Sequence, residues 1–127
     1  MPGPNLNKVF LIGRLTRDPE LRYTSSGQAV TTFGLAVNRE YTTKGEKREE
    51  TCYVNLVVWG KQAEITAEFL RKGNLVFIEG RLNYRTWENE DSEKRSILEV
   101  TVEKFQFLEK PQVNLEKEEE RNGEIQE

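Results

Sequence analysis

Histidine is absent from the 127 residues, and Cys52 is the only cysteine. The missing histidines remove the commonest general base and the commonest metal ligand, and a single cysteine can form neither an internal disulfide nor a structural zinc site. Gly60 and Lys61 lack the earlier glycine and the following serine or threonine of a phosphate-binding loop. The sequence therefore argues against an enzyme, and we expect no metal and no cofactor.

Long apolar runs are also missing. No stretch of about 18 apolar residues could span a membrane. The N-terminus does not show the positive region followed by an apolar stretch that marks a secretory signal. We therefore expect a cytoplasmic protein, and its length fits one domain of ordinary size plus a tail.

The negative charge is unevenly distributed along the chain. The net charge is −3, yet residues 1–110 are nearly neutral, whereas six of the last 17 residues are glutamates and only two are basic. This pattern predicts a folded domain over residues 1–110 and a disordered acidic tail over residues 111–127. Because the domain is nearly neutral, a surface that binds an anionic partner must be a local patch.

Turn signals separate short runs rich in β-branched and aromatic residues, which predicts five strands at 7–15, 29–38, 51–59, 75–83 and 96–107. Apolar residues at helical spacing predict a helix over 61–72, and Gly73 can adopt the left-handed conformation that ends it. This all-β order is that of the OB-fold, a five-stranded Greek-key barrel with one helix between the third and fourth strands. The connections 39–50 and 84–95 are long, which is typical of functional loops.

Alternation along the third predicted strand separates two faces. One face carries Cys52, Val54, Leu56 and Val58, and we expect it to line the core. The other face carries Tyr53, Asn55, Val57 and Trp59. An exposed row with two large aromatics can hold nucleic-acid bases by stacking. Packing of these aromatics under a loop or against a partner subunit is the alternative.

Two further aromatics, Tyr41 and Trp87, fall in the long connections. Trp87 has polar neighbours and no apolar periodicity that would bury it. A large apolar side chain in such a setting favours a role in binding a partner. The alternative is that it anchors the loop onto the barrel.

The first and fourth predicted strands are apolar on both faces. We expect the inner faces to carry Val9, Leu11, Leu15, Val76, Ile78 and Leu82, and the outer faces to carry Phe10, Ile12, Leu75 and Phe77. A barrel strand needs only one buried face, so the second apolar face predicts a contact between subunits. Phe10, Phe33, Phe69, Phe105 and Phe107 lie in regular elements, and packing is the expected role of all five.

Several segments closely resemble the bacterial single-stranded DNA-binding proteins. They are residues 7–15 (NKVFLIGRL), 18–23 (DPELRY), 59–64 (WGKQAE), 69–73 (FLRKG) and 78–82 (IEGRL), in the same order as in that family. The resemblance covers residues 5–108. It implies an OB-fold that assembles as a homotetramer and coats single-stranded DNA, without reading its sequence, during replication, repair and recombination at the nucleoid.

The resemblance also implies roles for individual residues. The base-stacking positions of the family fall on Tyr41, Tyr53, Trp59 and Trp87. Its phosphate-binding positions are basic here at Lys8, Arg22, Lys61, Lys72 and Arg85.

Some positions depart from the family pattern. Two stacking positions that are often tryptophan are tyrosine, Asn55 and Thr86 stand where relatives can carry a cation, and Val54 replaces a histidine at a subunit boundary. The printed C-terminus lacks the Pro-Phe tip through which the family recruits replication and repair enzymes. The alternatives left open are a dimeric replication-restart protein, an RNA-binding OB module, and an assembly protein that buries the same aromatics between subunits.

Overall fold

The computed structural model describes residues 3–109, which form six strands and one helix. In chain order these are β1 (Val9–Leu15), β2 (Glu20–Tyr23), β3 (Ala29–Thr43), β4 (Glu46–Trp59), α1 (Lys61–Phe69), β5 (Leu75–Glu88) and β6 (Lys94–Phe107). The predicted tail, residues 111–127, lies outside the described residues, so the boundary of the folded domain remains a prediction.

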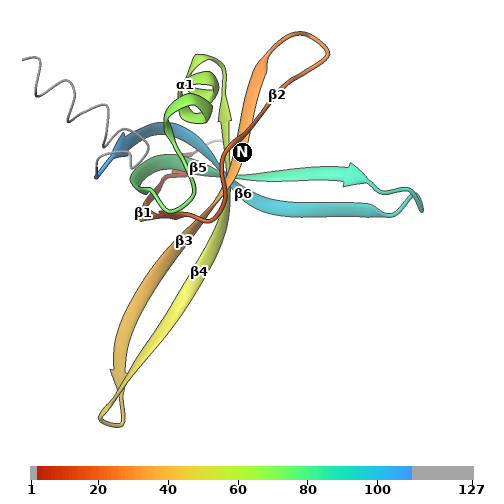
Figure 1. Cartoon of the computed structure of the whole chain (residues 1–127). Helices are drawn as coiled ribbons and strands as arrows, with labels where there is room; N and C mark the ends of the chain where they lie inside the picture. The colour runs from red at the N-terminus through yellow and green to blue at the C-terminus, as the bar shows by residue number, and fades with distance from the viewer. Residues whose placement is uncertain (1–2, 110–127) are drawn as a thin grey trace, which may run out of the picture.

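The strands close into a barrel (Figure 1). They follow the order β1-β5-β6-β4-β3-β2, and an additional pairing of β1 with β3 closes the sheet on itself. All pairings are antiparallel except that of β4 with β6, which is parallel at Leu56 and Val57. The predicted OB-fold is confirmed, with α1 between the third and fourth of the five barrel strands. The short strand β2, which pairs with the edge of β3, was not predicted.

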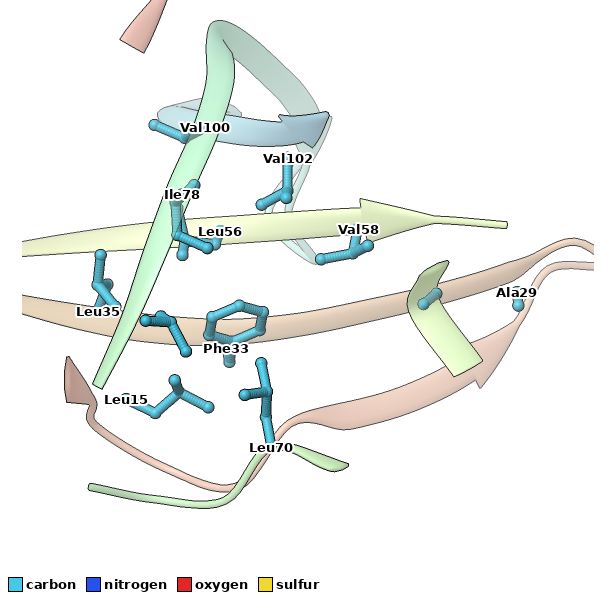
Figure 2. Packing of buried hydrophobic residues seen from close by; sticks show 12 residues of the cluster. Leu15, Ala29, Phe33, Leu35, Leu56, Val58, Leu70, Ile78, Val100 and Val102 are labelled. Atoms are coloured by element: carbon cyan, nitrogen blue, oxygen red, sulfur yellow. The ribbon is translucent and has the colours of Figure 1, made fainter. Parts of the chain in front are cut away.

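The barrel is filled by the inner faces of its strands. Phe33 lies among Leu15, Leu35 and Leu70, and all four side chains are almost completely buried (Figure 2). The alternation predicted for the third strand is confirmed at Leu56 and Val58, which are buried in the core, while Val54 packs against it. Each fully buried side chain of this size stabilises the fold by roughly 1.5–3 kcal/mol.

The helix α1 closes one end of the barrel against β3. The hydroxyl of Thr31 donates a hydrogen bond of 2.7 Å to the carbonyl oxygen of Ala63, and both residues are fully buried. The helix ends at Phe69, three residues earlier than predicted, because Leu70 adopts an extended conformation and inserts into the core. Gly73 has the expected left-handed conformation, with φ of +91°, but it lies in the turn that follows the helix.

The two predicted long loops are mostly strand, so this part of the prediction was wrong. Only residues 44–45 separate β3 from β4, and residues 89–93 separate β5 from β6. Both hairpins extend well beyond the barrel as two arms (Figure 1). Lys44 and Gly45 both have positive φ, as in the two-residue turns that join hairpin strands. Charged and polar residues occur on both faces of each arm, so no regular alternation in the sequence reveals their strands.

Some side chains that were predicted to pack are exposed. Cys52 and Leu82 were expected to face the core, but they lie where the arms leave the barrel and no opposing layer covers them. Phe69, which was assigned to packing, is 44% exposed at the end of α1. Phe10, which was also assigned to packing, is 60% exposed on the outer face of β1. Strand alternation gives the face on which a side chain lies, and burial additionally requires a layer that covers this face.

Candidate nucleic-acid interface

One continuous sheet face runs across the outside of β3, β4, β6 and β5. Val57 pairs with Thr101 across β4 and β6, and Asn83 pairs with Glu99 across β5 and β6. Because directly paired residues share a face, alternation along each strand extends this face in both directions. We call it the outer sheet face, and its members include Val30, Thr32, Tyr53, Val57, Trp59, Asn83, Arg85, Trp87, Glu99 and Thr101.

A groove of about 350 Å³ lies on the outer sheet face. Strand β2 contributes Glu20 and Arg22, and the outer sheet face contributes Val30, Thr32, Val57, Trp59, Arg85 and Glu99. The groove therefore combines an indole and two valines with two acidic and two basic side chains. Such a lining can hold a planar, partly apolar group with polar edges.

Three of the four predicted stacking residues lie on the outer sheet face. Tyr53 is 74% exposed, Trp59 is 44% exposed and Trp87 is 41% exposed. Trp59 lines the groove. Trp87 lies on the β5–β6 arm, where its ring faces the guanidinium of Arg85 at 4.9 Å. The side chains are thus accessible to a ligand within the isolated chain.

Tyr41 is placed differently from the other three aromatics. It pairs with Arg48 at the far end of the β3–β4 arm, and alternation puts it on the opposite side of the arm from Tyr53. Arg39, on the same side, lies 5.1 Å from the Tyr41 ring. The structure therefore does not bring Tyr41 onto the outer sheet face.

The predicted phosphate-binding cations fall into two groups. Lys8, Arg22 and Arg85 each form an ion pair with a carboxylate. Within residues 3–109, Lys61 and Lys72 form no such pair, although the backbone N–H of Lys72 donates to Asp18. Paired cations must share their charge with an internal partner, so Lys61 and Lys72 are the most available of the five.

Lys8 does not line the groove and immediately precedes β1. Its ammonium is 3.1 Å from a carboxylate oxygen of Glu103 and 3.2 Å from one of Glu79. The hydrogen bond from the ammonium to Glu103, together with a second one to Glu79, raises the pKa of Lys8 above its usual range. Lys8 thus remains charged, but two carboxylates already neutralise it.

Glu99 is a member of the groove that the sequence analysis missed. It is only 4% exposed, and its carboxylate lies 3.4 Å from Nε of Arg85. Glu99 is the only charged residue between Ile97 and Val102, a signal that could have drawn attention to it. Its position beside Arg85 depends on the β5–β6 register, which the sequence does not reveal.

The outer faces of β1 and β5 carry the predicted subunit contact. Phe10 and Ile12 are 60% and 53% exposed, and the rings of Phe10 and Phe77 stack with centroids 6.3 Å apart. Leu75 and Phe77 are only half-buried. The isolated chain leaves this apolar surface open to solvent. Neither a metal-binding cluster nor a helix able to cross a membrane occurs among residues 3–109.

Comparisons with known proteins agree on one family. The single-strand binding protein family matches residues 6–108. Single-stranded DNA-binding protein A of Bacillus subtilis is 51% identical over 104 residues, which are 82% of this chain and 60% of that protein. Single-stranded DNA-binding protein 2 of Listeria monocytogenes is 47% identical over 111 residues, or 87% of this chain and 69% of the relative.

Solved structures give the same result. The single-strand binding protein of Plasmodium falciparum, in complex with single-stranded DNA, superposes with a TM-score of 0.77 at 29% identity, covering 86% of this chain and all of that one. A deletion variant of the Thermus aquaticus single-stranded DNA-binding protein gives a TM-score of 0.72 at 43% identity, covering 82% of this chain and 51% of that one. The chain thus spans between about half and the full length of these matched proteins.

Proposed function

Because the chain belongs to the single-strand binding protein family, we propose that it binds single-stranded DNA, independently of base sequence, by stacking bases on the outer sheet face. The observation that carries this proposal is the exposure of Tyr53, Trp59 and Trp87 on one sheet face that includes a groove. Every base has a π-face, so stacking tolerates any sequence and contributes roughly 1–3 kcal/mol per base.

The cations complete the proposed site. Lys61 and Lys72 have no carboxylate partner in the described chain and are therefore the first candidates for phosphate contacts. Arg22 lies in the groove but is paired with Glu20, so it must exchange this carboxylate for a phosphate. Lys8 must do the same with Glu79 and Glu103. Phosphate contacts of this kind fix the path of the strand without reading its bases.

Tyr41 is the fourth proposed stacking residue. Its place on the other side of the β3–β4 arm means that one extended strand cannot lie flat on Tyr41 and Tyr53 together. A DNA strand that reaches both must pass around the arm. The bound DNA would then follow a path that is longer than the outer sheet face of one barrel.

We further propose that the chain assembles as a homotetramer through the outer faces of β1 and β5. Phe10, Ile12, Leu75 and Phe77 form an apolar surface there, and Phe10 and Ile12 are more than half exposed in the isolated chain. In a closed symmetric oligomer, such a surface is buried against the same surface of another copy of the chain.

In the cell, the proposed role is to coat and protect single-stranded DNA in the cytoplasm, at the nucleoid, during replication, repair and recombination. We expect no catalytic activity. Replication and repair enzymes would be partners through the family's C-terminal tail if the full-length protein carries one. In this account, residues 1–110 are the DNA-binding domain.

Competition binding tests the proposal. A labelled oligo-dT is bound by the protein, and unlabelled single-stranded DNA of mixed sequence, duplex DNA and single-stranded RNA are added as competitors. Single-stranded DNA of any sequence should displace the label, and duplex DNA should fail to do so. Effective competition by the duplex would refute the proposal, and a strong preference for RNA would favour an RNA-binding module.

A further inference from the structure

Glu99 places a buried negative charge on a surface that we propose binds a polyanion. Its side chain is only 5% exposed, and it lies in the groove with Val57 and Trp59. On charge alone, a carboxylate in this place opposes DNA binding. Burial of a carboxylate is also costly unless a partner compensates it.

Arg85 is the partner of Glu99. Its Nε lies 3.4 Å from Oε1 and 3.5 Å from Oε2 of the carboxylate, while its own side chain remains 57% exposed. The two residues come from different strands and lie diagonally across the β5–β6 ladder, because Glu99 is two residues beyond Ile97, the direct partner of Arg85. The carboxylate thus fixes the inner edge of the guanidinium.

The other side of Arg85 faces Trp87. The guanidinium carbon lies 4.9 Å from the centre of the indole ring, within the range of a cation–π contact. Both residues lie on the outer sheet face of β5, two positions apart. Glu99, Arg85 and Trp87 therefore form a chain of contacts from the floor of the groove to an exposed aromatic on the arm.

We propose that Glu99 is a positioning residue that holds Arg85 against Trp87, so that Arg85 orients the indole for base stacking rather than neutralising a phosphate. This inference rests on the proposed function and assigns Arg85 a role other than the phosphate contact expected from the sequence. The planar guanidinium suits the task because it pairs with a carboxylate through its edge and stacks through its face.

The sign of the effect of Glu99→Gln on affinity tests the proposal. Removing a negative charge from a DNA-binding groove tightens binding if charge alone matters. We expect the opposite, a loss of about fivefold or more in the affinity for oligo-dT, because Arg85 loses its anchor. Glu20→Gln is the matched comparison, since Glu20 lines the same groove and pairs with Arg22, for which no cation–π contact occurs among residues 3–109. This variant should bind oligo-dT more tightly than the wild type, because it removes the same charge from the groove and leaves the contacts of Arg85 with Glu99 and with Trp87 in place.

Arg85→Lys separates positioning from charge. Arg85 is largely exposed, so this variant does not depend on the core, and its charge is preserved. A lysine cannot pair through an edge and stack through a face at once. We expect Arg85→Lys to weaken binding about as much as Glu99→Gln does. The slope of log affinity against log salt should stay unchanged for Arg85→Ala, whereas loss of a phosphate contact reduces the magnitude of this negative slope by about 0.7.

Fluorescence of the free protein supplies a readout that is independent of DNA. In a Trp59→Phe background, Trp87 is the only tryptophan. Adding Glu99→Gln should increase quenching of Trp87 by acrylamide and lower its emission anisotropy, with circular dichroism and the unfolding temperature confirming that the barrel is intact.

Three results would overturn the inference: Glu99→Gln that binds as tightly as the wild type, Arg85→Lys that keeps full affinity, or unchanged acrylamide quenching. If the wild type fails to bind oligo-dT at all, the proposed function is wrong. The quenching experiment then still decides whether Glu99 positions Trp87.

Discussion

Trp59 combines two properties that distinguish a binding residue from a packing residue: it lines the groove, and it is 44% exposed. We predict that Trp59→Ala weakens oligo-dT binding by about 1–3 kcal/mol, the usual contribution of one stacked base. Phe69→Ala is the control, because Phe69 is equally exposed but lies on α1, away from the outer sheet face. Equal losses in the two variants, measured by fluorescence anisotropy of a labelled oligonucleotide, would mean that stacking is not localised to this face.

Among the cations, Lys61 and Lys8 provide the sharpest contrast. Lys61 has no carboxylate partner among residues 3–109, whereas Lys8 contacts both Glu79 and Glu103. For single-stranded DNA, loss of one phosphate contact reduces the magnitude of the negative slope of log affinity against log salt by about 0.7. We predict this change for Lys61→Ala and a smaller one for Lys8→Ala. The reverse order, in titrations over a range of salt concentrations, would show that internal ion pairing does not decide which cations bind phosphate.

The elements show which features the sequence could reveal. Alternation in β4 correctly assigned Tyr53 and Trp59 to one face and Leu56 to the core, because a covered barrel strand repeats every two residues. The arms were missed because their strands are covered on neither face and show no such repeat. The contact of Glu99 with Arg85 was missed because it depends on register between β5 and β6, a long-range property.

The pairing of β5 with β6 is irregular between Glu79 and Gly80, where β6 carries one extra residue, Glu103. A Cβ atom at Gly80 would overlap the backbone oxygen of Thr101. We predict that Gly80→Ala destabilises the barrel by about 1–3 kcal/mol, as overpacking typically does. Cys52→Ala, on the exposed part of β4, should change the free energy of unfolding by less than about 0.5 kcal/mol. Denaturant unfolding checks both values, and a fully stable Gly80→Ala would show that this close approach is not required.

For the whole molecule, the apolar surface of β1 and β5 predicts assembly. Light scattering at micromolar concentration should give the mass of four 14.8 kDa chains. Phe10→Glu and Phe77→Glu should each reduce this mass, because a charge would be buried in the contact. Leu98→Glu is the control, since Leu98 is a 48% exposed apolar residue on the β5–β6 arm. A monomeric wild type would refute the assembly.

The central claim is that bases stack on the outer sheet face. Tryptophan emission during titration with oligo-dT tests it most directly, because the only two tryptophans, Trp59 and Trp87, both lie on this face. In Trp59→Phe only Trp87 emits, and in Trp87→Phe only Trp59 emits, so the two variants report on each indole separately. The account predicts that oligo-dT quenches the emission of both single-tryptophan proteins as it binds. Full binding of a labelled oligo-dT with no change in either emission would contradict it.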